Sequence, residues 1–72
     1  MKIINGGAET LILGTCKISN NWREKHTTRI EFIGTKDKNG VNEIYIVLKP
    51  YAEVQEFLES DNKILEAIFH KE

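Results

Sequence analysis

Residues 26–49 read HTTRIEFIGTKDKNGVNEIYIVLK, and this stretch decides the fold. Polar and apolar side chains alternate over 26–35 and again over 42–49, which is typical of antiparallel strands with one face in water. Between them, residues 36–40 end in Asn39-Gly40. This dipeptide favours a tight turn because glycine adopts a positive φ at little cost. The stretch therefore predicts a β-hairpin.

Two further strands are predicted before the hairpin, over residues 1–5 and 9–19, with a glycine pair between them. Gly14 lies inside the second strand, where a glycine often marks a bulge or a bend. Residues 20–25 are polar and turn-prone except for Trp22, which indicates a loop.

The periodicity of the chain changes from two to helical after Pro50, a residue that suits the first position of a helix. Apolar residues between Tyr51 and Phe69 then cover one arc of a helical projection, but Asp61 lies in the middle of that arc. A carboxylate against the core is unfavourable without a partner, whereas Ser60-Asp61-Asn62 favours a new helix start. We therefore predict helices over 51–59 and 61–71, with a single kinked helix as the alternative.

The fold class predicted from these elements is α+β, in one domain over residues 1–72. About four strands form a small antiparallel meander, and the C-terminal helix or helix pair packs on one of its faces. The predicted core follows the alternating strand faces and the centre of the helical stripe. It contains Ile12, Ile18, Ile30, Phe32, Ile44, Ile46, Leu48, Val54, Leu58, Leu65 and Ile68.

The opposite strand faces also carry apolar side chains, namely Leu11, Leu13, Ile33, Tyr45 and Val47. A contiguous apolar patch on a surface usually marks an interface, so one interpretation is a homodimer. The other is a strongly curled sheet, in which these residues meet inside a small barrel-like core.

The composition bounds the class of protein. The chain has 72 residues, 10 Lys and Arg, 11 Asp and Glu, and a net charge of −1. The balance is that of an ordinary globular protein, rich in lysine, isoleucine and asparagine as in AT-rich bacterial or phage genomes. No apolar run reaches the length of about 20 residues that a membrane helix needs. Because the single cysteine excludes an internal disulfide and no leader is visible, we expect a cytoplasmic location and no membrane association.

The sequence predicts no metal site, no cofactor and no enzymatic activity. Cys16, His26 and His70 lie on three different predicted elements, without the close ligand pairs that zinc sites show. Cys16 shares a strand face with Ile12 and Ile18, which predicts a buried and unreactive thiol.

The segment Trp22-Arg23-Glu24-Lys25 is the strongest candidate for binding, because tryptophan and arginine are enriched at interaction hot spots. Two interpretations of Trp22 stay open: it folds back over the edge of the core, or it contacts a partner.

Charged residues are distributed unevenly along the chain. Residues 1–38 carry seven Lys or Arg and four Asp or Glu, a net +3, and residues 39–72 carry three and seven, a net −4.

The predicted function is that of a small non-catalytic protein-binding module. We expect a phage- or mobile-element-type accessory protein that modulates or inhibits a larger host protein. The expected contacts come from the loop, the next strand and the acidic helix: Trp22, Arg23, Lys25, Arg29, Glu53, Glu56 and Glu59. The alternative is a small nucleic-acid or nucleotide binder that uses Trp22, Arg23, Lys25 and Arg29. The net charge of −1 argues against this alternative, because dedicated nucleic-acid binders are usually basic.

Overall fold

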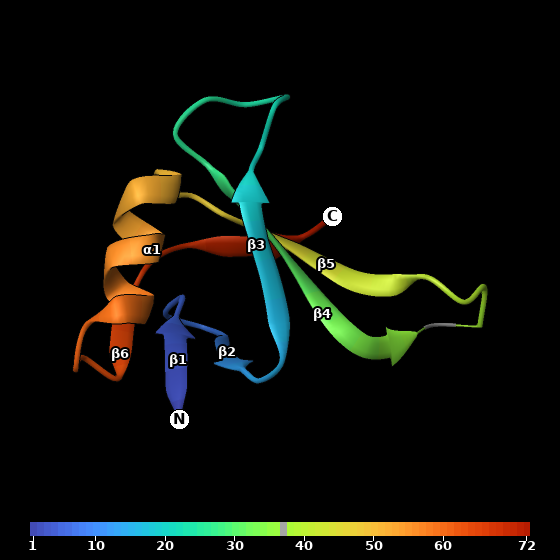
Figure 1. Cartoon of the computed structure of the whole chain (residues 1–72), viewed down its shortest axis with the longest axis horizontal. Helices are drawn as coiled ribbons and strands as arrows, with labels where there is room; N and C mark the ends of the chain where they lie inside the picture. Colours follow the sequence, from blue (N-terminus) through green and yellow to red (C-terminus); the bar gives the residue numbers. More distant parts are fainter. Residues whose placement is uncertain (37) are drawn as a thin grey trace.

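The chain folds into two small β-sheets and one helix, which confirms the predicted α+β class (Figure 1). The computed structural model describes residues 1–36 and 38–72, and for residues 35 and 36 the backbone alone. In chain order its elements are β1 (Lys2–Asn5), β2 (Thr10–Leu13), β3 (Cys16–Asn20), β4 (Thr28–Lys36), β5 (Asn42–Val47), α1 (Tyr51–Glu59), β6 (Ile64–Glu66) and β7 (Phe69–Lys71). Sheet A has the strand order β2-β1-β6, and sheet B has the order β3-β4-β5-β7.

The predicted hairpin is present as β4 and β5 in sheet B. The two strands are antiparallel, with Ile30 opposite Tyr45 and Arg29 opposite Ile46. The register shifts between Glu31 and Lys36, so the outer part of the hairpin is irregular. Gly40 has the positive φ of 75° that the turn prediction requires. Asp37, which belongs to the same predicted turn, lies outside the described residues.

The segment predicted as one strand over 9–19 is two strands that belong to different sheets. β2 pairs with β1 in sheet A, and β3 pairs with β4 in sheet B. The break falls at Gly14 and Thr15, which belong to neither strand, so the bend that a glycine inside the predicted strand indicates is present. The corner at Gly14 therefore carries the chain from one sheet to the other.

The predicted helix over 61–71 is wrong, and so is the kinked single helix, whereas the helix over 51–59 is confirmed as α1. Residues 64–71 form β6, which runs parallel to β1, and β7, which runs antiparallel to β5. Buried Ala67 and Phe69 alternate with exposed Ile68 and His70, which is a period of two. Short apolar runs fit either periodicity. The strands prevail because β1 and β5 each offer an unpaired edge that supplies backbone hydrogen bonds.

The core lies between the two sheets and α1. Its buried members are Ile4, Leu11, Ile30, Phe32, Val47, Val54, Ala67 and Phe69, with Leu13, Cys16, Ile18, Tyr45, Leu58 and Leu65 partly buried against them. The ring of Tyr45 contacts Phe32 and Phe69 edge to face, with centroids 5.7 and 6.0 Å apart. Such pairs stabilise beyond the area that they bury.

Four of the predicted core positions lie outside the core: Ile12, Leu48 and Ile68 are exposed, and Ile44 is half-buried. Ile46 is buried as predicted, but on the face of β5 opposite Tyr45 and Val47. The inner positions of β5 are instead Tyr45 and Val47. Residues 44–48 are apolar without interruption, so the strand carries no internal signal of which face turns inward.

The apolar patch predicted on the outer strand faces is inside the molecule. Leu11 and Val47 are buried, and Leu13 and Tyr45 pack against the core. The curled arrangement is therefore the one observed, and these residues cannot form the predicted dimer interface. Ile33 is the member of that set that stays exposed.

Lys2 joins the first strand to the end of the helix. Its ammonium group donates hydrogen bonds to the carbonyl oxygens of Phe57, Ser60 and Asn62 at 3.0, 2.6 and 2.5 Å. It also lies 4.8 Å from the centroid of the Phe57 ring. The last carbonyl oxygens of a helix lack donors within the helix and form its negative end. A cation placed there donates hydrogen bonds to these oxygens and interacts favourably with the helix dipole.

Phe32→Ala is expected to lower the free energy of unfolding by about 3–5 kcal/mol, because it leaves a cavity beside Tyr45. Denaturant unfolding of the variant measures this loss. Ile33→Ala is the matched control, since Ile33 is the exposed neighbour on the same strand. Its expected effect is about 1 kcal/mol or less. Equal losses for the two variants would contradict the described face of β4.

Lys2→Met is expected to cost about 1–3 kcal/mol, because three carbonyl oxygens lose a charged donor. Lys17→Met removes an exposed lysine from β3 and is expected to change stability by less than about 0.5 kcal/mol. A Lys2→Met variant as stable as the Lys17→Met variant would show that the three hydrogen bonds of the Lys2 ammonium group contribute nothing to stability.

Candidate functional site

The loop between β3 and β4 is held in shape by its own hydrogen bonds (top of Figure 1). The Asn21 side-chain amide donates to Thr27 Oγ1 at 2.9 Å, and Thr27 Oγ1 donates to the Glu24 carbonyl oxygen at 2.7 Å. Asn21 Oδ1 also accepts a hydrogen bond from the backbone N–H of Arg23 at 3.3 Å. Asparagine and threonine fix turns in this way. Because Thr27 is buried, these bonds anchor the loop at its base.

Trp22 stands in solvent at the tip of this loop. Its exposed fraction is 93%, so the interpretation that it covers the edge of the core is wrong. The surrounding loop does not need the indole ring for its shape, since its hydrogen bonds involve Asn21, Glu24 and Thr27. A large apolar ring is thus presented outward by a segment that is already ordered.

A surface pocket of about 400 Å³ lies beside the loop, on the outer face of sheet B. Its lining comes from the loop, β4, β5 and the C-terminal strand: Asn20, Asn21, Trp22, Arg23, Glu24, Arg29, Ile46, His70 and Glu72. Arg29, Ile46 and His70 form one cross-strand row, because Ile46 is paired with both of the others. Ile46 is only 5% exposed although it faces away from the core, so its neighbours on this face cover it.

The charges around the pocket have both signs. The Arg29 guanidinium lies 3.6 Å from a Glu31 carboxylate oxygen and 3.5 Å from one of Glu72. These two carboxylates orient Arg29 along the sheet and offset its charge. Arg23 makes no ion pair with any residue that the structure describes, so its guanidinium is available at the rim.

The predicted site residues fall into two separate groups. Trp22, Arg23 and Arg29 line the pocket on sheet B, and Lys25 lies on the same loop but outside the lining. The acidic residues of α1 lie elsewhere.

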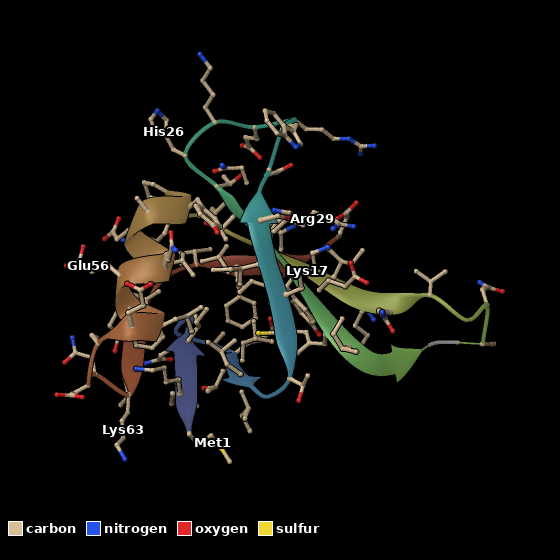
Figure 2. All side chains as sticks on the ribbon, viewed as in Figure 1. Met1, Lys17, His26, Arg29, Glu56 and Lys63 are labelled. Atoms are coloured by element: carbon tan, nitrogen blue, oxygen red, sulfur yellow. The ribbon has the colours of Figure 1, made fainter. Side chains whose placement is uncertain are left out.

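On α1, Glu53 is 3.6 Å from the ammonium group of Lys49. Glu59 is exposed, and Glu56 points away from both sheets (Figure 2). Glu53 and Glu56 line another surface pocket, of about 290 Å³, together with Phe57 and Ile64. The acidic helix face and the Trp22 pocket therefore do not make one site.

Sequence reasoning missed Ile46, His70 and Glu72 as site residues. Ile46 is predicted as a core residue and is buried, but on the face of β5 that carries the pocket, and His70 is predicted on a helix. The available signal was the hairpin itself, since pairing β4 with β5 sets Ile46 beside Arg29.

The thiol and histidine groups do not assemble. Within residues 1–36 and 38–72, no three His, Cys, Asp or Glu side chains are grouped so that they could hold a metal ion. Cys16 is half-buried on β3, opposite Phe32. Burial raises the pKa of its thiol, which lowers the fraction of reactive thiolate near neutral pH.

No protein-family model, curated protein or solved structure matches this chain. In the part of the chain that the structure describes, no helix is long and apolar enough to span a membrane. Inference about function therefore depends on the geometry of the surface itself.

Cys16 is expected to react with an aromatic disulfide reagent much more slowly in the native protein than in denaturant. Both its partial burial and its raised pKa disfavour attack by the thiolate. Absorbance of the released chromophore, followed at pH 7 and pH 9, measures the rate. The native rate should rise with pH. Equal rates in the folded and unfolded chain would show a fully accessible thiol.

Proposed function

We propose that this protein is a non-catalytic binding module whose protein partner docks on the Trp22 pocket. The observation that carries the proposal is an indole ring, 93% exposed, on a hydrogen-bonded loop beside a pocket of about 400 Å³. Exposed aromatic and arginine side chains of this kind dominate the energy of protein interfaces.

The loop lowers the cost of binding. Association is opposed by the ordering of loops and side chains, and a loop already fixed by Asn21 and Thr27 loses little freedom. Trp22 then supplies a large contact area with few rotatable bonds. Ile46, which is only 5% exposed, contributes little accessible surface to the pocket, and Arg23 offers a charged donor at its rim.

In this proposal the protein is a bacterial or phage accessory protein, located in the cytoplasm, that modulates or inhibits a larger host protein. The small size and the rigid projecting loop suit insertion into a cleft of that partner. The unpaired Cys16 agrees with a reducing compartment. The acidic face of α1, with Glu56 and Glu59 exposed, is a second surface for contact with a basic partner.

The nucleic-acid alternative has weaker support. Arg23 and Lys25 are exposed beside Trp22, as in proteins that stack bases on aromatic rings. However, Arg29 is engaged by Glu31 and Glu72, and Glu24 and Glu72 line the pocket. These carboxylates would repel a phosphate backbone.

Trp22→Ala is expected to abolish capture of the partner from bacterial lysate by the immobilised protein, a weakening of about 2 kcal/mol or more. Stability should change by less than about 0.5 kcal/mol, because Trp22 is exposed. Val41→Ala, an exposed apolar position beyond the pocket lining, is the matched control and should capture the partner like the parent. Nuclease treatment of the lysate should leave the captured protein unchanged.

Trp22 is the single tryptophan of the chain, so its fluorescence reports directly on the site. The free protein should emit like a water-exposed indole, and the emission should shift to shorter wavelength when the captured partner is added. Capture that survives Trp22→Ala would overturn the proposed site. Capture that nuclease abolishes, together with steep salt dependence of oligonucleotide binding, would favour the nucleic-acid alternative.

A further inference from the structure

β7 is the last strand of sheet B, and hydrogen bonds beside both of its ends show which of its backbone groups face β5. The Leu48 N–H donates to the Ile68 carbonyl oxygen, and the Glu72 N–H donates to the Ile44 carbonyl oxygen, both at 2.9 Å. Hydrogen-bonded and non-hydrogen-bonded pairs alternate along an antiparallel ladder. His70, which lies midway between these two pairs, therefore directs its backbone N–H and carbonyl groups toward β5.

The backbone groups of Phe69 and Lys71 consequently point away from β5, to the open edge of the sheet. Their N–H groups and the Phe69 carbonyl oxygen make no hydrogen bond to any residue that the structure describes. The Lys71 carbonyl oxygen lies 3.4 Å from the ring Nδ1 of His70. Open N–H and C=O groups at a sheet edge are a template for pairing with another chain.

A surface pocket of about 590 Å³ borders this edge. The three residues of β7 line one side of it, and Glu9, Thr10 and Leu11 line it from the start of β2. Leu11, Phe69 and the further lining residue Tyr45 belong to the core or pack against it. The pocket therefore offers an apolar surface directly beside the outward backbone groups of β7.

The formal charges of this pocket come from Glu9 and Lys71. The Lys71 ammonium group lies 3.5 Å from a carboxylate oxygen of Glu43, which offsets its charge. Glu9 is exposed and makes no ion pair with the residues whose side chains the structure describes. The pocket thus favours a ligand that carries positive charge next to an apolar group.

We propose that an extended segment of a partner protein pairs antiparallel with β7 and becomes the fifth strand of sheet B. Alternate residues of the segment are apolar and point toward Leu11, Tyr45 and Phe69, because paired residues of neighbouring strands share a face. At least one of the other residues is basic and is attracted by Glu9. Antiparallel pairing is the more stable kind, and strand addition of this type combines main-chain hydrogen bonds with side-chain pockets.

The walls of the pocket favour one extended chain over a second folded copy of the protein. β7 lies on one side and residues 9–11 lie on the other, so the edge of a whole sheet has less access than a single strand. The site is also separate from the Trp22 pocket, although His70 lines both. This inference goes beyond the proposed function and does not depend on it.

A short synthetic peptide in which lysine and valine alternate, with both ends blocked, is the probe. Added to 15N-labelled protein, it should shift the amide resonances of Phe69 and Lys71 in a saturable manner and leave that of Gly40, in the hairpin turn, unchanged. In the free protein, the Phe69 and Lys71 amides should exchange hydrogen with water faster than the His70 amide, which the ladder to β5 protects.

Backbone N-methylation of the peptide tests the pairing directly. In the antiparallel arrangement the valines lie opposite Phe69 and Lys71, and their N–H groups face β7. Methylation of the valine nitrogens should weaken binding by about tenfold or more, because the hydrogen bonds to the strand edge are lost. Methylation of the lysine nitrogens, which face away from β7, should leave the dissociation constant within about twofold of that of the parent peptide.

A matched pair of variants tests the same edge from the side of the protein. Lys71→Pro removes an N–H that points away from β5, so the ladder to β5 is kept while the open edge loses a donor. This variant should bind the peptide about tenfold more weakly or worse. Lys71→Ala keeps the N–H and should bind like the parent. Circular dichroism and thermal unfolding establish that both are folded, and the methylated peptides decide the question if Lys71→Pro is not.

Equal binding of the two methylated peptides would overturn the proposal, and so would a loss of binding on methylation of the lysines alone. A mass in light scattering that rises above 8.3 kDa with concentration, but not for Lys71→Pro, would show that a second copy occupies the edge instead. Trp22→Ala should bind the peptide like the parent, so failure of this proposal and failure of the Trp22 site are distinguishable.

Discussion

The ammonium group of Lys2 fixes the point at which the end of α1 meets the start of β1. It donates to three carbonyl oxygens at and beyond the C-terminus of the helix, those of Phe57, Ser60 and Asn62. The Phe57 oxygen also accepts from the Ser60 backbone N–H and hydroxyl, so the end of the helix is capped from both sides. The chain leaving α1 is thereby held beside β1, and the Lys63 carbonyl oxygen accepts a hydrogen bond from the backbone N–H of Ile3 at 2.8 Å. From that contact β6 continues in parallel with β1, so the third strand of sheet A depends on where the helix ends.

Residues 64–71, which contain β6 and β7, then join the two sheets. Ala67 lies between β6 and β7, is buried, and donates its backbone N–H to the Asn5 carbonyl oxygen at 3.1 Å. One residue later, the Ile68 carbonyl oxygen accepts from Leu48 on the sheet B side at 2.9 Å. The crossing is close enough that a Cβ on Gly6 would lie 2.8 Å from the Phe69 ring. A glycine in the β1–β2 turn is therefore required for the two sheets to meet at Phe69.

Local sequence patterns were sufficient to predict the elements whose conformation depends on residues close to one another in the chain. The hairpin, β1 and α1 follow from alternation, from Asn39-Gly40 and from Pro50. The face of β5 could not be predicted, because residues 44–48 are all apolar and only pairing with Arg29 and Glu31 orients them. Residues 61–71 fit both periodicities, and distant strand edges decided between them. Trp22, Arg23 and Arg29 could be selected by residue type, and pairing within the predicted hairpin sets Ile46 beside Arg29. His70, in contrast, enters the site only because β7 pairs with β5, a contact between segments that local patterns do not connect.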